Sequence, residues 1–533
     1  MPQAGRLAHM KVEVMGTARA QSPAPGAAMN GRTRKLATLL TASLVLTGCA
    51  GLQPVELPPE YTPPPVETPL WQAVSRIRDD NWHILLDRGP EALDWRLTAI
   101  DSAADSIDLQ TFLWEWDSVG SMVMDHLIAA ADRGVQIRVL IDDSFLFEGE
   151  RELIALHPHP NIEYRVFNPF TRRGDNDVVR QLLNAAEFHR LDHRMHNKAM
   201  VVDNRVAFVG GRNLADEYFG LHPEANFRDL ELLVGGPIVG DVSRAFDNYW
   251  NDEWSFPSGR LSLESLSAPD LAEIRAGLLP SGTLHRETST AARTERWLEA
   301  VRDALPGEPR LYADDPPGRD PTAPSSQPVQ LAQELIALFD GAQEEILVIS
   351  AYLIPTSGLE DAVTRALRRG VSVKMLTNSL RSNNHLIAHS VYRNHIGTLL
   401  SAGASMHEVR IDARDRDLYM LTPVEEKHLA LHAKALVIDH DRVFIGSTNL
   451  DPRSLRINTE MGLLVESETL NAAVRQAVAP NFLRANAWEL RYGDDGRIRW
   501  VADDFVLDQQ PAYTFMQRVE DWFFSYLPVE DEM

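Results

Sequence analysis

The sequence predicts an α/β protein made of two homologous halves that pack about a pseudo-two-fold axis. The phrase HNKAMVVDNRVAFVGGRN, which begins at His196, returns as HAKALVIDHDRVFIGSTN from His432. A stretch from Arg96 and a second from Glu334 both read as helix, strand, loop, helix and strand. Strands that alternate with helices indicate parallel or mixed α/β layers. A site built from one copy of each phrase would lie where the two halves meet.

The first α/β copy is predicted to end its first helix near Ala104 and to form a strand over 107–113. A helix over 122–131 follows, and Arg133-Gly134 is typical of a helix end before the strand 135–141. The second copy repeats this, with Arg369-Gly370 before a strand over 371–376.

The loop ADDPPGRDPTAPSSQP, from Ala313, is rich in Pro and Asp and is predicted to separate the halves. We assign 71–290 to the first half, with its motif at 191–217. The second half is expected over 291–533, with its motif at 427–453.

Residues 1–49 are predicted to be an N-terminal extension followed by a lipoprotein signal peptide. Three basic residues precede a short apolar run, and Leu46-Thr47-Gly48-Cys49 resembles a bacterial lipobox, in which the cysteine is lipidated. Met29 would be a normal start for this signal. The alternative is an ordinary secretory signal or a buried helix with a chance LTGC.

Residues 50–70 are predicted to be an extended tether, because seven prolines interrupt the stretch that follows Cys49. At ~3.1 Å per residue such a tether could reach roughly 60 Å. Ala50 after the cysteine resembles the outer-membrane sorting signal of enterobacterial lipoproteins. We therefore expect a location in the bacterial cell envelope, lipid-anchored through Cys49 at the outer membrane and facing the periplasm.

Composition limits the classes of partner. The chain has 533 residues and a net charge of -24 at pH 7, which argues against wrapping nucleic acid. Cys49 is the only cysteine, so no intramolecular disulfide can form.

The repeated phrase reads as a strand, on which residues two apart share a face. His196 and Lys198 then point the same way, as do His432 and Lys434. Plain alternation puts the aspartate of each phrase on the other side, so it is expected to orient or support structure, although it is counted among the catalytic candidates as the last member of the motif. These aspartates are Asp203 and Asp439.

The turn after each strand carries glycine and neutral donors, at the same offset from the histidine in both copies. Asn213, Ser447 and Asn449 are the candidate phosphate-binding side chains. A single H-x-K on a strand is commonly chance. Its duplication with the same following turn favours function, and a duplicated but inactive scaffold is the remaining alternative.

Two His, two Lys and two Asn around one pocket suit a phosphodiester. One neutral His can attack phosphorus and form a phosphohistidine, and the other can protonate the leaving oxygen. The Lys and Asn groups would neutralise charge on the phosphate oxygens. This chemistry needs no metal or other cofactor.

The duplicated motif resembles the phospholipase D superfamily, whose mark is this H-K-D triplet in two copies. RMHNKAMVVDNRVAFVGGRNLADEYF and LHAKALVIDHDRVFIGSTNLDPRSLRINTEMG look like the bacterial cardiolipin synthases, and the C-terminal sequence looks like the C-type subgroup. The resemblance implies two phospholipase D-like α/β sandwich halves and phosphatidyl transfer. It also implies His196 as the nucleophile and His432 as the acid and base.

Two downstream acids match the family pattern, in which such an acid hydrogen-bonds a catalytic His. They are Asp229 in FRDLELL and Glu460 in NTEMGLL, and the alternative for each is a charge at a strand end. Gly211 stands where Ser447 stands, so the half-sites should not be equivalent. Arg212 either compensates for the missing hydroxyl or faces solvent.

Two aromatic segments, FLWEWDSVG from Phe112 and WFFSYL from Trp522, could seat the protein in a lipid interface or pack internally. The expected partners are the membrane surface and phospholipid substrates, phosphatidylglycerol and phosphatidylethanolamine among them. The resemblance also leaves room for a small accessory protein.

The main functional hypothesis is cardiolipin synthesis from two phospholipids. The alternatives are a hydrolytic phospholipase D that releases phosphatidic acid, a nuclease or other phosphodiesterase, and a non-catalytic membrane scaffold. The motif residues are the same for transfer and hydrolysis.

Overall fold

The computed structural model describes residues 52–146, 159–172, 177–261, 289–318, 320, 330–383 and 385–526. By its contacts the chain divides into Met1–Leu52 and Gln53–Met533, and every described helix and strand lies in the second unit. The predicted signal peptide and Cys49 fall outside the described residues.

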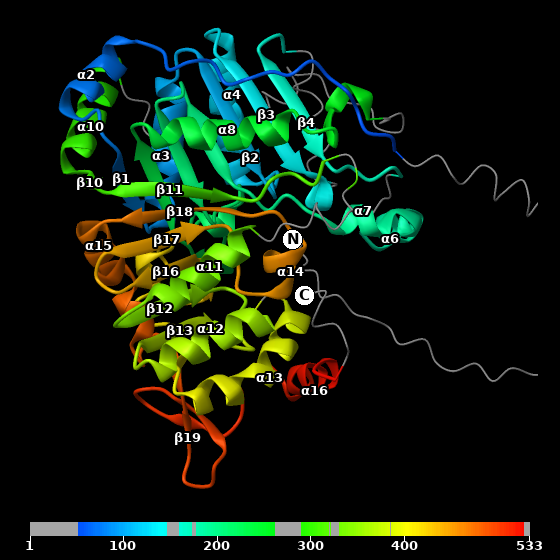
Figure 1. Cartoon of the computed structure of the whole chain (residues 1–533), viewed down its shortest axis with the longest axis vertical. Coiled ribbons are helices and arrows are strands. Elements are labelled where there is room, and N and C mark those ends of the chain that lie inside the picture. The colour runs from blue at the N-terminus through cyan, green and yellow to red at the C-terminus, as the bar shows by residue number, and fades with distance from the viewer. Residues whose placement is uncertain are drawn as a thin grey trace, which may run out of the picture. The chain divides into compact units, whose positions relative to one another are not determined.

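The first half is built on a nine-stranded sheet in the order β10-β1-β8-β6-β5-β2-β3-β4-β9 (Figure 1). The pairs β2–β3 and β3–β4 are parallel, and the remaining neighbours are antiparallel. The strands are β1 (Trp82–Leu86), β2 (Ser106–Thr111), β3 (Gln136–Asp142), β4 (Ile162–Phe167), β5 (Ala199–Val202), β6 (Val206–Gly210), β8 (Glu231–Gly235), β9 (Ser255–Pro257) and β10 (Leu305–Pro306). The helices are α2 (Pro69–Ile77), α3 (Gly89–Ser102), α4 (Ser118–Asp132), α6 (Asp177–Leu183), α7 (Phe188–Asp192), α8 (Ile238–Trp250) and α10 (Thr290–Asp303).

The second half repeats this arrangement in a ten-stranded sheet, in the order β11-β18-β17-β16-β12-β13-β14-β19-β20-β21. From β11 to β14 it matches the first sheet from β1 to β4 strand for strand. The strands are β11 (Glu308–Ala313), β12 (Glu345–Ser350), β13 (Ser372–Asn378), β14 (Ser405–Val409), β16 (Lys434–Ile438), β17 (Arg442–Gly446), β18 (Met461–Glu466), β19 (Ala487–Tyr492), β20 (Ile498–Val501) and β21 (Val506–Leu507). The helices are α11 (Gln330–Gly341), α12 (Ser357–Arg368), α13 (Leu386–Ala402), α14 (Pro452–Arg456), α15 (Glu468–Val478) and α16 (Phe515–Phe524).

The predicted repeat is therefore present in the fold, including its turn chemistry. Gly134 and Gly370 follow α4 and α12 with φ of 101° and 90°, a left-handed conformation that glycine adopts without strain. The two halves share a core, because one cluster of buried apolar residues joins Val201 and Leu232 of the first sheet to Ile349 and Val437 of the second. They also share a two-stranded parallel sheet, β7 (Ala225–Arg228) with β15 (His428–Leu431).

The boundary between the halves lies later than the predicted residue 290. Helix α10 packs on α2 and α3, where the buried Trp297 ring meets Trp71 at 5.5 Å and Trp95 at 5.0 Å. Strand β10 pairs with β1, and β11 is the first strand of the second sheet. The Pro- and Asp-rich loop from Ala313 follows β11, so it lies inside the second half rather than between the halves.

The predicted tether is not extended away from the fold over its described residues. Residues 52–68 lie along the first half as a strap, and the backbone NH of Val55 donates to the Glu253 carbonyl at 2.8 Å. The Thr62 hydroxyl lies 2.9 Å from Asp108 Oδ2, 3.0 Å from Asp247 Oδ1 and 2.8 Å from Arg138 Nη2. Proline keeps this strap extended, and several of its polar atoms bond the first half.

Among the described residues, no helix combines the length and the apolar character needed to span a bilayer.

Candidate active site

The two repeated phrases meet where the halves meet, because the segment before each strand bonds to the opposite half. The backbone NH of His196, ahead of β5, donates to the Thr459 carbonyl at 2.9 Å. The NH of His432, ahead of β16, donates to the Arg228 carbonyl at 2.9 Å. Each histidine is thus held by backbone from the other half.

Each histidine also bonds an acidic side chain from the opposite half. His196 Nδ1 lies 2.9 Å from both carboxylate oxygens of Glu460, and His432 Nδ1 lies 2.7 Å from Asp229 Oδ2. Both carboxyl groups are fully buried. With Nδ1 engaged, Nε2 is the nitrogen that each ring can offer to a substrate. The two acids thus lie where the sequence analysis expected them, each serving the histidine of the other half.

The lysines lie beside the histidines, but β5 begins at Ala199 and β16 at Lys434, so the histidines precede the strands and the predicted shared strand face is not formed. Lys198 Nζ donates to the His196 carbonyl at 2.7 Å, and Lys434 Nζ donates to the His432 carbonyl. Burial lowers the pKa of Lys198 to about 7 and that of Lys434 to about 8. A bound phosphate anion would favour the protonated form of both amines.

Both imidazoles are held neutral. Burial, followed by the charge of Lys198 and Lys434, lowers the pKa of His196 well below its usual range. Burial and Lys434 lower the pKa of His432 to about 3. A neutral imidazole can attack phosphorus, so the free site is in a nucleophilic state.

The two acids differ in charge. Burial raises the pKa of Glu460 to about 8. Burial also acts to raise the pKa of Asp229, but His432 and Lys434 outweigh it and hold that pKa well below its usual range. The His432–Asp229 pair therefore contains an ionised carboxylate at neutral pH, and the half-sites are inequivalent as expected.

Ser447 contacts Glu460, and its hydrogen bond acts to lower the pKa of that carboxyl, against the larger effect of burial. Its hydroxyl donates to Glu460 Oε2 at 2.5 Å and accepts from the Met461 NH at 3.0 Å. At the matching place in the first half, a Cβ on Gly211 would lie 2.4 Å from Asp229 Oδ1. Ser447 is thus a positioning residue for Glu460, and its contact with a substrate phosphate stays a prediction.

Arg212 neither replaces that hydroxyl nor faces solvent. Its buried guanidinium donates to the backbone carbonyls of Tyr218, Leu86 and Asp229. It ties together the loops behind Asp229.

The two candidate asparagines are buried beside the histidines' strands. Asn213 Nδ2 lies 2.8 Å from the Tyr218 hydroxyl, and Tyr218 packs edge-on against the His432 ring at 4.9 Å. The Oδ1 atoms of Asn213 and Asn449 accept no hydrogen bond from the described residues. Because amide O and N positions are interchangeable in such a network, a hydroxyl donated by Tyr218 to Oδ1 would free the Asn213 NH₂ for an anion.

The motif aspartates do not belong to the reacting group. The Asp203 carboxylate accepts from the indole of Trp71 at 2.7 Å and from the backbone NH groups of Ala104, Asp105 and Ser106. Asp439 accepts from the NH groups of Gln343, Glu344 and Glu345 and from Arg442. Both therefore close the turn between a helix and the strand that pairs with the motif strand. Their assignment to the catalytic group is corrected, and their expected structural role is the one observed.

The sequence analysis missed a second matched pair. Asp142 ends β3 and accepts the Met195 NH at 2.9 Å, and Asn378 ends β13 and accepts the Leu431 NH at 2.8 Å. Each holds the residue just before a motif histidine. Their equal place at the end of a repeated strand was a usable signal, but only the fold brings those strand ends to the histidine segments.

Phe112 was considered for membrane contact, but it lies at the site. Its ring meets the His196 ring at 4.8 Å, and Lys198 Nζ lies 5.2 Å from its centre. Trp114, in the same segment, is buried. This aromatic loop packs internally.

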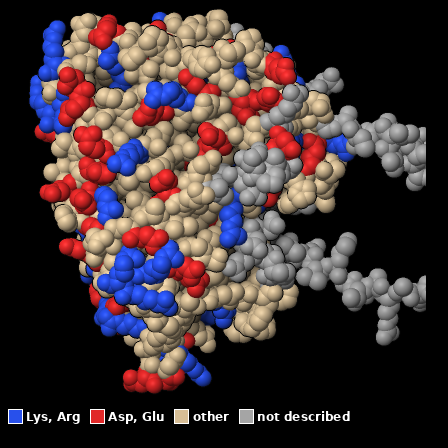
Figure 2. Space-filling view, in the orientation of Figure 1, with Lys and Arg blue, Asp and Glu red and all other residues tan. Residues whose placement is uncertain are grey.

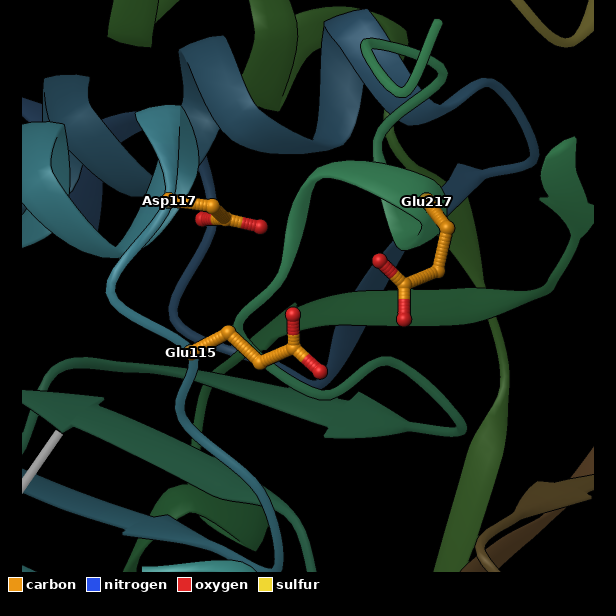
Figure 3. A group of neighbouring side chains, drawn as sticks. All are labelled: Glu115, Asp117 and Glu217. Atoms are coloured by element: carbon orange, nitrogen blue, oxygen red, sulfur yellow. The ribbon is translucent and has the colours of Figure 1, made fainter. Parts of the chain in front are cut away.

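Three acids near the first half-site, Glu115, Asp117 and Glu217, bring their carboxylate oxygens within 4.8 Å of one another (Figure 3). Asp117 caps the start of α4 by accepting the Gly120 NH at 2.9 Å. Burial raises the pKa of Asp117 to about 7 and that of Glu217 to about 8, so the cluster carries a reduced negative charge near neutral pH. The group includes none of the residues of the repeated motif.

Comparison with known proteins agrees with the repeat. The family model described as "Cardiolipin synthase, PLD-like domain" matches residues 97–250 and 335–479. Cardiolipin synthase C of Escherichia coli (strain K12) is 34% identical over 84% of this chain and 94% of its own length. The major cardiolipin synthase ClsA of Bacillus subtilis (strain 168) is 24% identical, over 74% of this chain and 67% of its own length.

Among solved structures, phosphatidylserine synthase of Haemophilus influenzae Rd KW20 shares the fold. It aligns with a TM-score of 0.51 at 14% identity, over 80% of this chain and 92% of that chain. From its two matched segments and its relatives, the chain belongs to the phospholipase D-like cardiolipin synthase family, and it is a phosphatidyltransferase of the phospholipase D type.

Proposed function

We propose that the protein makes cardiolipin by transferring a phosphatidyl group from one phospholipid to the headgroup hydroxyl of phosphatidylglycerol. The observation that carries this proposal is the pair of neutral, buried histidines, each held at Nδ1 by an acid from the opposite half. Two buried lysines beside them suit a phosphodiester substrate. The named relatives are cardiolipin synthases.

In the first step, His196 Nε2 attacks phosphorus and the bond to the headgroup oxygen breaks. Binding of the phosphate anion favours uptake of a proton from solvent by His432, which becomes an imidazolium that keeps its Nδ1–H bond to Asp229. This imidazolium gives its Nε2 proton to the headgroup oxygen, which leaves as glycerol from phosphatidylglycerol or as ethanolamine from phosphatidylethanolamine. In the second step, the headgroup hydroxyl of the acceptor gives its proton to His432 and attacks phosphorus, and the P–N bond breaks. The products are cardiolipin and free His196.

The charge difference between the two acids supports this division of roles. The ionised Asp229 stabilises the imidazolium that His432 must form, and the negative phosphate adds to that effect. His196 faces the less charged Glu460 and the two lysines, which favour its neutral, nucleophilic form.

We further propose that Cys49 is lipidated and holds the protein at the bacterial outer membrane, facing the periplasm. The strap is bonded to the first half from Val55 onward, so few residues separate the lipid from the folded unit. Replacing Cys49 by Ala in the full chain should move the protein from the membrane fraction to the soluble fraction. Unchanged membrane fractionation and unchanged mass at the mature N-terminus would refute this anchor.

The activity is tested with the chain from Ala50 onward, which keeps every described element, in vesicles of phosphatidylethanolamine and phosphatidylglycerol. Mass spectrometry of the lipids should show cardiolipin, and both His196→Ala and His432→Ala should abolish it. Phosphatidic acid alone would identify a hydrolase that uses the same site. Lipid turnover that survives in both variants would refute the two-histidine mechanism.

A further inference from the structure

Helix α16 is packed with its polarity reversed. In a helix that packs on a protein core, the apolar face is normally the buried one. In α16 the buried residue is Asp521, whereas Phe515, Trp522 and Phe523 are 74%, 50% and 57% exposed. Figure 2 shows a largely uncharged surface at the position that α16 occupies in Figure 1.

A buried ion-pair network holds α16 with its polar face inward. Asp521 Oδ1 lies 2.8 Å from His389 Nδ1, and Asp521 Oδ2 accepts from Arg393 Nη1 at 3.0 Å. Both partners lie on α13, and Asp521 and His389 are fully buried. Such a network fixes which face of the helix points inward, because rotating the helix would leave a buried charge without its partner.

Helix α6 of the first half repeats the pattern. Its Arg180 is 1% exposed and donates to the Asp143 carbonyl at 3.1 Å. Leu182 and Leu183 of the same helix are 72% and 43% exposed, and Phe188, at the start of α7, is 54% exposed. Each half therefore presents one short apolar face to solvent while a charged side chain faces inward.

Helix α16 lies beside the active site. Gln517 donates to the Leu380 carbonyl at 3.0 Å, and the Tyr513 hydroxyl lies 3.2 Å from His428 Nδ1. Leu380 follows closely after Asn378, which holds the residue before His432.

Helix α6 approaches the site from the first half. It leads through α7, which ends at Asp192, directly into the His196 segment. Arg453 at the start of the second half's α14 donates to Asp192 Oδ1 at 2.7 Å. Figure 1 shows α6, α7, α14 and α16 on one side of this unit.

The strap begins on this side as well. Val55 is bonded to Glu253, and the next residue, Trp254, lies under the Arg190 guanidinium of α7 at 4.5 Å. An extended chain from Cys49 to Val55 spans at most about 20 Å. A lipid on Cys49 would therefore enter a bilayer close to α7, which makes a lipid surface the occupant that fits these exposed faces.

We propose that α6, the start of α7 and α16 form a docking surface that seats the protein on the phospholipid headgroups of a bilayer. The docking surface consists of Leu182, Leu183, Phe188, Phe515, Trp522 and Phe523. This inference rests on the proposed function, because the bilayer carries the substrate. Since the chain has a net charge of -24, binding comes from insertion of apolar side chains and should not weaken in high salt.

The test measures partition of the chain from Ala50 onward into vesicles of phosphatidylethanolamine and phosphatidylglycerol, by sedimentation. Trp522→Ser combined with Phe523→Ser should lower the partition coefficient at least about tenfold, and Leu182→Ser should lower it about threefold or more. Val506→Ser is the matched control, because Val506 is 55% exposed but lies on β21 at the far edge of the second sheet. It should bind vesicles like the unmodified chain.

Turnover of monomeric short-chain phosphatidylglycerol separates docking from chemistry. The docking variants should keep this turnover and lose turnover on vesicles. Equal vesicle binding by all variants would overturn the proposal. So would binding that disappears at about 0.5 M salt, where attraction between exposed charges is largely screened. Failure to bind vesicles together with self-association that the serine variants abolish would assign the surface to a protein partner instead. Absent turnover of both lipids with intact vesicle binding would refute the proposed function and leave the docking surface standing.

Discussion

Replacing Gly211 by Ala should lower turnover by moving Asp229 away from His432, although the added methyl group does not contact the histidine. A Cβ on Gly211 would lie 2.4 Å from Asp229 Oδ1 and 2.9 Å from Oδ2, closer than real Cβ contacts. The carboxylate has little room to retreat, because Oδ1 accepts the Leu230 NH at 2.7 Å and Oδ2 bonds His432 at 2.7 Å. The added methyl group must therefore displace the carboxylate from His432.

The cost follows from the bond that is lost. A hydrogen bond to a charged group contributes about 1.5–3 kcal/mol, which corresponds to about 10- to 150-fold in rate. The assay is the initial rate of lipid turnover in phosphatidylethanolamine and phosphatidylglycerol vesicles. Ser447→Ala is the matched change in the second half. It removes the hydroxyl from Glu460 without adding bulk, so its loss should be smaller, about 2- to 10-fold.

Two results would refute this reasoning. One is a Gly211→Ala protein that turns over lipid at the original rate. The other is a loss that adds in full to the loss caused by Asp229→Asn, because two changes that break the same bond should not be additive. Thermal unfolding of each variant separates a misplaced carboxylate from a misfolded chain.

Three further predictions concern stability. Asp203→Asn should lower the free energy of unfolding by about 1–3 kcal/mol, because fewer acceptors face the three backbone NH groups. Turnover per folded molecule should stay unchanged. A selective loss of turnover would restore Asp203 to the catalytic group. Thr62→Val should lower the free energy of unfolding by about 1–3 kcal/mol and make the strap more sensitive to protease. An unchanged melting temperature would mean that the bonds of Thr62 add no stability. The folded-state pKa of Glu217 is raised to about 8 from 4.5, so this carboxyl removes stability as the pH rises from about 4.5 to about 8. The free energy of unfolding of Glu217→Gln, minus that of the unmodified chain, should therefore be about 1–2 kcal/mol larger at pH 8 than at pH 4.5. An equal difference at both pH values would contradict the raised pKa.

Much of the architecture was readable from repetition. The Arg-Gly helix ends, the strand alternation and the two copies of the phrase are local signals, and each depends on residues close together in the chain. The same local geometry predicted that Lys198 lies beside His196 and that Asp203 serves structure. The proximity of Lys198 to His196 was predicted correctly although neither residue lies within β5, because two residues so close in the chain remain close in space.

Other predictions failed because they depend on long-range contacts. Prolines in residues 50–70 indicated an extended conformation, which residues 52–68 adopt before α2 begins at Pro69, but they could not indicate that Thr62 would bond Asp108 and Asp247 of the first half. The composition of the loop from Ala313 predicted that it separates the halves, but composition does not report strand pairing, and the assigned boundary at residue 290 was also wrong. The pairing of β10 with β1 and the burial of Trp297 decided it instead.

The sequence by itself determined the duplication, the histidine and lysine pairs and the residue types of the site. Only the tertiary structure decided that Glu460 serves His196 and Asp229 serves His432, that Ser447 bonds Glu460, and that α16 turns its aromatic face outward. The physical reason is that side-chain chemistry is set residue by residue. Partner, burial and pKa are set by what packs around a residue from distant parts of the chain.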